Sequence, residues 1–259
     1  MKKIAVALFT MTLVLNSCKN ETKTDTIKVD KKTTSTTVST VEIIPISHAT
    51  MVLNYAKETI YVDPTGGKEA FEGQKEPTIV LITDIHGDHL NFDTLKALDL
   101  KNALIVAPQA VVDKFPEDFK PNFNVIANSE TSIVNNTIIE AIPMYNLRED
   151  ALKFHAKGRG NGYVLTIGGQ RIYISGDTED IPEMRELKNI DKAFVCMNLP
   201  YTMTVDSAAS AVLDFKPKQV YPYHYRGTEG LSDVAKFKTL VNNANPDIKV
   251  VQLDWYSDN

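Results

Sequence analysis

Short apolar runs separated by polar turn segments make up most of the chain. Three runs rich in β-branched and aromatic residues come first, at residues 41–46, 51–55 and 59–62, and their spacing predicts a strand meander. The nearly continuous apolar run at residues 78–83 predicts a buried strand, and the leucine spacing of residues 91–100 predicts a helix after it. Strands that alternate with helices in this way indicate sheets covered by helices.

The second half of the chain has the same order, with strands first and strand–helix units afterwards. A hairpin pattern centres on Gly168 and Gly169, and Thr204 has the position of a helix N-cap. The predicted elements are strands at residues 122–128, 132–136, 137–143, 161–175 and 219–224, and helices at residues 204–215 and 231–243. Because no repeat and no long low-complexity break follows residue 40, we expect one domain over residues 41–259. Its predicted fold is α/β, an αββα four-layer sandwich of mixed sheets covered by helices.

Composition limits the class of partner. The 259 residues are 43% hydrophobic and 24% charged, which is enough apolar material for a sizeable core. The formal net charge is -5, and no basic stripe occurs beyond the first thirty or so residues. We therefore expect no nucleic-acid partner. The sequence leaves the oligomeric state open.

The first residues predict export. Two lysines precede an apolar run at residues 4–15, which is too short to span a membrane comfortably. The run ends in Leu15-Asn16-Ser17-Cys18, which resembles a bacterial lipobox and implies a signal peptide at residues 1–17 and a lipidated Cys18. Residues 18–40 are rich in threonine and lysine and predict a flexible tether. We expect a lipid-anchored protein of the bacterial cell envelope, facing the periplasm or the cell surface. A plain secreted protein and an uncleaved anchor are the alternatives.

The other cysteine, Cys196, lies in the strand-like run AFVCM. A single buried thiol is more often a small core residue than a nucleophile. If Cys18 is lipidated, Cys196 has no partner for a disulfide.

All five histidines follow predicted strands or lie in the loops between them. The segment TDIHGDHL, residues 83–90, directly follows a buried strand and places four short polar side chains within six positions. A single histidine is usually a satisfied polar residue or a helix cap, but five at strand ends indicate a site on a sheet scaffold. Asp63 and Asp177 also end strands. The histidines are His48, His86, His89, His155 and His224.

The mixture of histidine and aspartate without thiolate favours zinc, with iron or manganese as alternatives. Asp84 and His86 are two positions apart, so they can point together from an extended segment. Gly87 permits a turn that brings Asp88 and His89 to a neighbouring position. One short loop would thus serve two metal ions about 3.5–4 Å apart, as in two-metal hydrolytic sites.

In combination these residues resemble the metallo-β-lactamase superfamily of metallo-hydrolases, over about residues 41–228. The superfamily signature HxHxDH after a buried strand corresponds to DIHGDH, the bridging aspartate to Asp177 in ISGDT, and the last histidine to His224 in YPYHY. Residues 46–67 resemble the branch that contains ascorbate-phosphate lactonase-like and N-acylphosphatidylethanolamine phospholipase D-like proteins. The resemblance implies the metallo-β-lactamase fold and two divalent metal ions.

The resemblance also assigns ligands, with two departures. Asp84 replaces the first histidine of the signature, which adds negative charge and either weakens the Lewis acid slightly or shifts the preference towards iron or manganese. Asn146 stands where related proteins often carry a further histidine, and His155 follows nine residues later. Either His155 completes the first metal site, which we favour, or Asn146 does and His155 contacts substrate. The expected metal ligands are Asp84, His86 and His155 in the first site, and Asp88, His89, Asp177 and His224 in the second.

The implied function is hydrolysis of an ester, lactone or phosphodiester bond in a small molecule by a metal-bound hydroxide. Asp88 is the expected catalytic residue, and Asp177 would keep the two metals together. His48, Asn146 and Tyr201 are the expected substrate-binding residues. Lys157 and Arg159 would attract an anionic substrate, although loop charges are usually just solvated. The alternative is a non-catalytic, metal-containing binding lipoprotein with a degenerate active site, for which the missing first histidine is the chief support.

Overall fold

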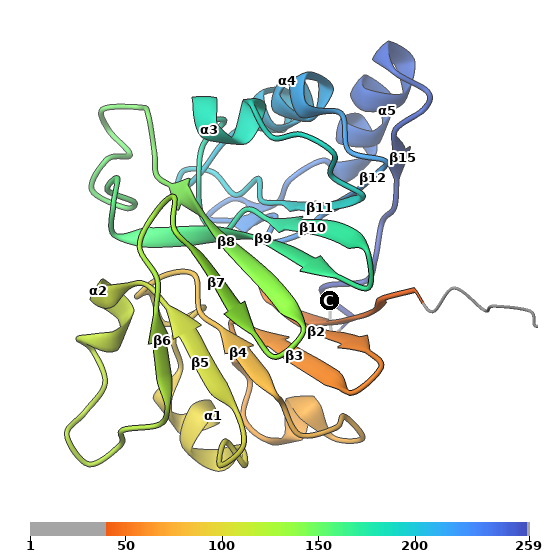
Figure 1. The fold of residues 1–259 in the computed structure, drawn as a ribbon. Coiled ribbons are helices and arrows are strands. Elements are labelled where there is room, and N and C mark those ends of the chain that lie inside the picture. The colour runs from red at the N-terminus through yellow and green to blue at the C-terminus, as the bar shows by residue number, and fades with distance from the viewer. Residues whose placement is uncertain (1–39, 258–259) are drawn as a thin grey trace, which may run out of the picture. The chain divides into compact units, whose positions relative to one another are not determined.

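The computed structural model describes residues 40–257, drawn in colour in Figure 1. The predicted signal peptide at residues 1–17, the lipidated Cys18 and the tether up to residue 39 lie outside the described residues. Within residues 40–257 no helix has the length and apolar character needed to cross a membrane.

The first half of the described chain forms a six-stranded sheet in sequence order, β1 to β6. The first three strands pair antiparallel as the predicted meander, and β3 to β6 pair in parallel. The strands are β1 (Glu42–Ser47), β2 (Thr50–Tyr55), β3 (Glu58–Val62), β4 (Ile79–Leu81), β5 (Leu104–Ala107) and β6 (Phe123–Val125).

The second half forms a seven-stranded sheet in the order β15-β12-β11-β10-β9-β8-β7. Strands β7 to β10 are antiparallel, whereas β10, β11, β12 and β15 run in parallel. A separate short hairpin pairs β13 (Arg226–Gly227) with β14 (Gly230–Leu231). The other strands are β7 (Thr131–Val134), β8 (Thr137–Met144), β9 (Gly160–Ile167), β10 (Gln170–Ile174), β11 (Lys192–Val195), β12 (Gln219–Pro222) and β15 (Lys249–Val250).

Helices cover the outer faces of the two sheets, as Figure 1 shows, so the predicted αββα sandwich is confirmed. The first sheet carries η1 (Glu69–Phe71), α1 (Phe92–Ala97) and α2 (Gln109–Val112), and the second carries α3 (Pro182–Arg185), α4 (Val205–Phe215) and α5 (Val234–Ala244). The burial of both faces of β4 explains why its sequence is continuously apolar. Ile79 and Leu81 face the core between the sheets, while Val80 faces the helix-covered side.

Two helices differ in length from the sequence prediction. Helix α5 begins at Val234 rather than at residue 231, because Gly230–Leu231 pairs in the β13–β14 hairpin and Asp233 accepts a hydrogen bond from the N–H of Lys236 at 2.8 Å. Helix α1 ends at Ala97. The predicted cap of α4 is confirmed, since the hydroxyl of Thr204 accepts from the Ser207 N–H at 3.0 Å.

Candidate metal centre

Loops that follow strand ends bring the predicted site residues together. His48 lies between β1 and β2, and the TDIHGDHL segment follows β4. His155 lies between β8 and β9, Asp177 follows β10 and His224 follows β12. Because the carboxyl ends of the parallel strands β10 and β12 lie at one edge of the second sheet, they direct Asp177 and His224 to the same region. The loop after β4 of the first sheet meets them there, since His89 contacts Asp177.

His89 is completely buried and is held through its Nδ1 atom. The carboxylate oxygen Oδ2 of Asp63 lies 2.8 Å from this nitrogen, and the Thr83 hydroxyl lies 3.0 Å from it. Asp63 is fixed in turn, because it accepts hydrogen bonds from the Thr83 N–H and hydroxyl at 2.8 and 2.7 Å. A carboxylate on Nδ1 keeps the hydrogen there and leaves the Nε2 lone pair for a metal ion.

The other two deep imidazoles are also contacted at Nδ1, but by different kinds of group. Nδ1 of His155 lies 3.2 Å from the carbonyl oxygen of Tyr201, which accepts, whereas Nδ1 of His224 lies 3.3 Å from the side-chain amide nitrogen of Asn198, which donates. Both histidines are buried. Their Nε2 atoms point inward, and the Nε2 atoms of His224 and His89 are 3.2 Å apart.

Asp177 lies at the centre of the three Nε2 atoms. Its Oδ2 is 3.3 Å from His89 and 3.2 Å from His155, and its Oδ1 is 3.0 Å from His224. One carboxylate thus touches ligand candidates from both halves of the site, which is the geometry of a bridging ligand. Gly176 supports this placement with φ +60°, and a Cβ there would lie 3.2 Å from the Thr83 Cβ and closer still to Met144.

A second group of potential ligands consists of Asp84, His86 and His155. Oδ2 of Asp84 lies 2.6 Å from His86 Nδ1 and 3.8 Å from His155 Nε2. Of the two candidates for completing this group, the structure brings in His155. Asn146 is buried behind it and donates hydrogen bonds to the carbonyls of Ala151 and Tyr201 at 2.9 and 2.7 Å.

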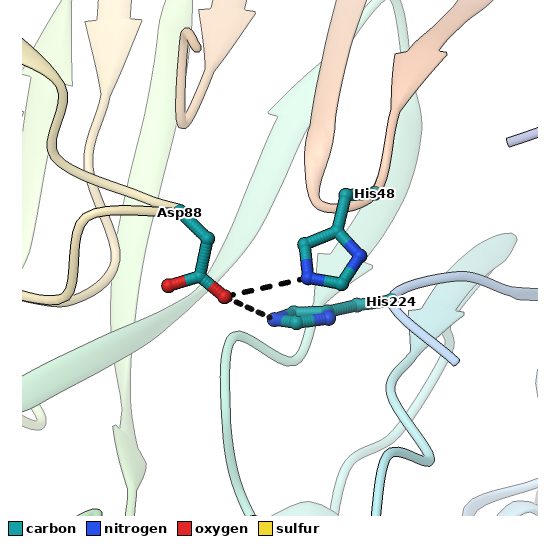
Figure 2. A group of neighbouring side chains, drawn as sticks. All are labelled: His48, Asp88 and His224. Carbon is teal, nitrogen blue, oxygen red and sulfur yellow. Dashed lines mark ion pairs between the residues drawn. The ribbon is translucent and has the colours of Figure 1, made fainter. Parts of the chain in front are cut away.

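Figure 2 shows the third group, in which Asp88 faces His48 and His224. Asp88 Oδ2 lies 3.3 Å from His48 Nε2 and 3.5 Å from His224 Nε2, and 43% of the Asp88 side chain is exposed. Nδ1 of His48 lies 2.8 Å from the hydroxyl of Tyr256, which itself accepts from the Arg226 N–H. Because a carboxylate only accepts, the Nε2–H of His48 donates to Asp88, which leaves Nδ1 to accept from the Tyr256 hydroxyl.

A cavity of about 380 Å³ opens beside these groups and is lined by His86, Asp88, Phe154, His155, Asp177, Asn198 and Tyr201. Tyr201 thus lies where a substrate-binding residue was predicted. Substrate contact stays a prediction for Asn146, which is buried beside His155, and for His48, which lies between Asp88 and Tyr256.

The expected attraction of an anion by the loop cations stays a prediction, and each cation has a carboxylate neighbour. Arg159 donates from Nε and Nη2 to the two oxygens of Asp84, at 3.1 and 2.9 Å. Lys157 pairs with Glu183 at 2.7 Å. Both cations therefore have carboxylate partners.

The donor set fits divalent cations. Two buried atoms at its centre, Nε2 of His155 and Oδ1 of Asp177, have no hydrogen bond of favourable geometry, although they lie 3.2 and 3.0 Å from Asp177 Oδ2 and His224 Nε2. Buried polar atoms without partners are rare in native proteins, and an ion is one of the few ways to satisfy them. Imidazole nitrogens and carboxylate oxygens without thiolate suit zinc, iron or manganese.

The ionisation of these groups is strongly coupled. Burial would raise the pKa of Asp177, but the neighbouring His224 and His89 hold it well below its usual range. Burial opposes a charge on His89 too, yet Asp177 and Asp63 raise its pKa well above the usual value. These carboxylates therefore favour a positive charge at the centre of the site.

The backbone at the site is strained. His48, Asp63 and His224 have φ of 56°, 44° and 46°, in the left-handed region that non-glycine residues seldom adopt. Such conformations cost about 1–3 kcal/mol each and gather at functional sites.

A family profile described as "Beta-lactamase superfamily domain" matches residues 42–224. The chain belongs to the metallo-β-lactamase superfamily. A UPF0173 metal-dependent hydrolase from Pyrococcus abyssi is 31% identical over 208 residues, covering 76% of this chain and 91% of that protein. The resemblance to the lactonase-like branch stays a prediction.

Solved structures agree with this membership of the superfamily. A chain from Parabacteroides distasonis, assigned as a metal-dependent hydrolase, has 38% identity and a TM-score of 0.73, covering 82% of this chain and 92% of its own. Igni18, a metallo hydrolase from Ignicoccus hospitalis, has 21% identity and a TM-score of 0.70, covering 83% and 96%. The second likeness concerns the superfamily fold alone.

The sequence did not predict the residues that hold Nδ1 of the site histidines in place. Asp63 gave a signal, since it ends a strand in YVDP, but its contact with His89 joins positions 26 residues apart. The Tyr201 carbonyl and Tyr256 gave none, because a backbone acceptor and a distant phenol leave no pattern near their partners.

Proposed function

We propose that this protein is a metal-dependent hydrolase that cleaves an ester, lactone or phosphodiester bond in a small molecule. The observation that carries the proposal is the common orientation of three buried imidazoles. Nδ1 of each is held by another group of the protein, so that the three Nε2 atoms surround Asp177. Outer partners of this kind orient and tune metal-ligating histidines. The metal-dependent hydrolases among the relatives support the same reading.

The proposed cofactor is a pair of divalent ions, zinc foremost, with iron or manganese as alternatives. Asp84, His86 and His155 would hold one ion. Asp88, His89 and His224 would hold the other, with Asp177 between the two. When bound, such ions polarise the scissile group and lower the pKa of water towards neutrality.

Asp88 has the properties of the residue that orients the attacking water. Burial raises its pKa, but the hydrogen bond from His48 and the charge of His89 outweigh this and lower the pKa below its usual range. Asp88 is therefore a carboxylate at neutral pH and accepts hydrogen bonds. With 43% of its side chain exposed, it faces the side from which substrate and water arrive. His48 keeps one of its oxygens fixed at 3.3 Å.

The cavity lining favours a neutral acyl group. Phe154 and Tyr201 pack edge to face, with ring centroids 5.0 Å apart, and form an aromatic wall. No lysine or arginine is among the lining residues of the described chain. An ester or a lactone would fit this wall, whereas the charge of a phosphodiester would be balanced by the metal ions alone.

The test combines metal analysis with a substrate panel. The purified chain, loaded with zinc, iron or manganese, is assayed for bound metal by plasma mass spectrometry and for turnover of aryl esters, lactones and phosphodiesters. We expect two equivalents of metal, together with turnover that Asp88→Asn abolishes. The matched control is Asp93→Asn, because Asp93 is an exposed carboxylate in the first turn of α1. A chain that binds no metal would refute the proposal.

The second candidate is a metal-containing binding lipoprotein without catalysis. It is favoured by one observation, that Asp84, paired with Arg159, stands where the signature has its first histidine. Two bound metal ions with no turnover of any panel member, unchanged by Asp88→Asn, would select this candidate.

We also propose that the protein is lipid-anchored in the bacterial cell envelope. The support is the lipobox-like sequence that ends at Cys18. Metabolic labelling with an alkyne fatty acid tests it, with Cys18→Ser as the variant and Cys196→Ser as the matched control. Equal labelling of the Cys18→Ser chain would exclude the anchor.

A further inference from the structure

A guanidinium group lies directly against the buried carboxylate of the Asp84, His86 and His155 group. Arg159 donates from Nε to Oδ1 of Asp84 at 3.1 Å and from Nη2 to Oδ2 at 2.9 Å, which is the two-pronged geometry of the strongest arginine–carboxylate pairs. Asp84 is fully buried, and the side chain of Arg159 is 20% exposed. Nη2 of Arg159 also donates to the carbonyl of Phe154, the residue before His155.

This pairing fixes the rotation of the carboxylate. Each oxygen of Asp84 has two acceptor positions, and Arg159 takes one on each. The remaining position on Oδ2 faces the imidazoles, 2.6 Å from His86 Nδ1 and 3.8 Å from His155 Nε2. The guanidinium therefore presents one oxygen of Asp84 to the metal group and keeps the other turned away.

The pairing also changes the charge of the site. Four aspartates lie within it, and among the described residues Arg159 is the one lysine or arginine that forms an ion pair with any of them. Arginine stays charged under all ordinary conditions, so it cancels the charge of Asp84 at every working pH.

We propose that Arg159 is a positioning residue that turns Asp84 into a ligand of no net charge. The pair Asp84–Arg159 does the work that a single neutral imidazole would do, and an aspartate at position 84 needs an arginine at position 159. This inference rests on the proposed two-metal site.

A mutant cycle on the full chain tests the pair. The probe is Zn²⁺, titrated against a chromophoric chelator, and the variants are Asp84→His, Arg159→Gln and the double variant. Co²⁺ absorption spectra of the same proteins report the coordination independently of any activity. The matched control is Arg171→Gln, which breaks a partly exposed arginine–carboxylate pair, Arg171–Glu140, at the start of β10.

Asp84→His alone leaves Arg159 unpaired beside the metal. We expect its zinc affinity in the first site to fall by about 10- to 100-fold, the range typical when a partner of a metal ligand is lost. The double variant has a neutral ligand and no stranded cation, so it should bind at least about tenfold more tightly than Asp84→His. Arg159→Gln in the wild-type background should not tighten binding, and it should change the Co²⁺ spectrum because both oxygens of Asp84 become free to coordinate.

Each outcome decides the matter. If Arg159→Gln changes zinc affinity by the same factor with aspartate or histidine at position 84, Arg159 acts only on the loop and the inference fails. If the wild type binds two zinc ions and the effects of the two substitutions on zinc affinity simply add, the proposed function stands and the inference fails. A wild type that binds no zinc refutes both. Melting curves in excess chelator identify variants that do not fold. Asp84→Asn, an isosteric change, replaces Asp84→His in the cycle if the larger side chain disrupts the apo fold, with the same rescue by Arg159→Gln expected.

Discussion

Replacing Asp63 by asparagine removes the charge behind His89 without changing the size of the side chain. Asp63 is completely buried, and its Oδ1 accepts from the Thr83 N–H at 2.8 Å. Its Oδ2 accepts from the Thr83 hydroxyl at 2.7 Å and lies 2.8 Å from His89 Nδ1. Because a carboxylate only accepts, it forces the hydrogen of His89 onto Nδ1 and leaves Nε2 free.

The size of the effect follows from these bonds. An asparagine that keeps the Thr83 N–H bond turns its NH₂ group towards His89, so the imidazole must move its hydrogen to Nε2 and lose its metal-binding lone pair. A hydrogen bond to a charged group contributes about 1.5–3 kcal/mol, which corresponds to roughly 10- to 100-fold in affinity. We therefore expect Asp63→Asn to weaken zinc binding by about 10- to 100-fold, in line with other outer partners of metal ligands.

Chelator competition with Zn²⁺ measures this change, and thermal melting in excess chelator checks that the metal-free fold survives. Asp93→Asn on the surface of α1 is the matched control and should bind zinc as wild type does. If a folded Asp63→Asn chain binds zinc as tightly as wild type, Asp63 does not determine which ring nitrogen of His89 carries the hydrogen.

Four further outcomes are expected. Zinc at a hundred times its dissociation constant stabilises a folded state by about 2.7 kcal/mol, so chelation should lower the melting temperature by roughly 5–10 °C; no shift would contradict metal binding. Because the pKa of His89 is raised, metal binding at neutral pH should release about one proton, and the metal affinity should fall as the pH falls. Calorimetry in buffers of different ionisation enthalpy measures the proton release, and a binding enthalpy that is the same in every buffer would refute it. Burial raises the pKa of the Cys196 thiol to about 11 from 9.0, so its stabilising contribution is present below pH 9 and is lost as pH rises through 11. Iodoacetamide at pH 8 should therefore label the Cys196 peptide only after denaturation, and labelling of the native chain would contradict this. Thr204→Ala removes the cap of α4 and should lower the free energy of unfolding by about 1 kcal/mol in urea titrations, with Thr239→Ala on the exposed face of α5 as the control.

The sequence indicated the residues that the structure brings together in the candidate site, because strand ends leave a local pattern. Residues 79–82 are all apolar because β4 is buried on both faces, and the polar cluster after them marks the point where the strand reaches the sheet edge. Asp177 and His224 follow β10 and β12 in the same way. Parallel strands bring such positions together, so contacts between distant segments could be predicted from local signals.

The partners of those residues could not be predicted, for a physical reason. Arg159 and Asp84 are 75 positions apart, and their contact depends on the course of an irregular loop between β8 and β9. No periodicity governs such a loop. The same holds for Asn146, whose sequence position suggested a ligand or a substrate contact, but whose amide instead bonds the carbonyls of Ala151 and Tyr201 beside His155.

The charge of the site decides how many cations it can hold. With neutral imidazoles, the carboxylates of Asp63, Asp84, Asp88 and Asp177 and the guanidinium of Arg159 leave three negative charges uncompensated. One divalent cation would leave the site negative, whereas two would leave it with one positive charge, which an anionic nucleophile then neutralises. Buried charge is tolerated only when it is paired. Without Arg159, two cations alone would make the site neutral, and it would no longer favour the ionisation of a water molecule. With two cations bound, the guanidinium that positions Asp84 would therefore also favour an anionic nucleophile.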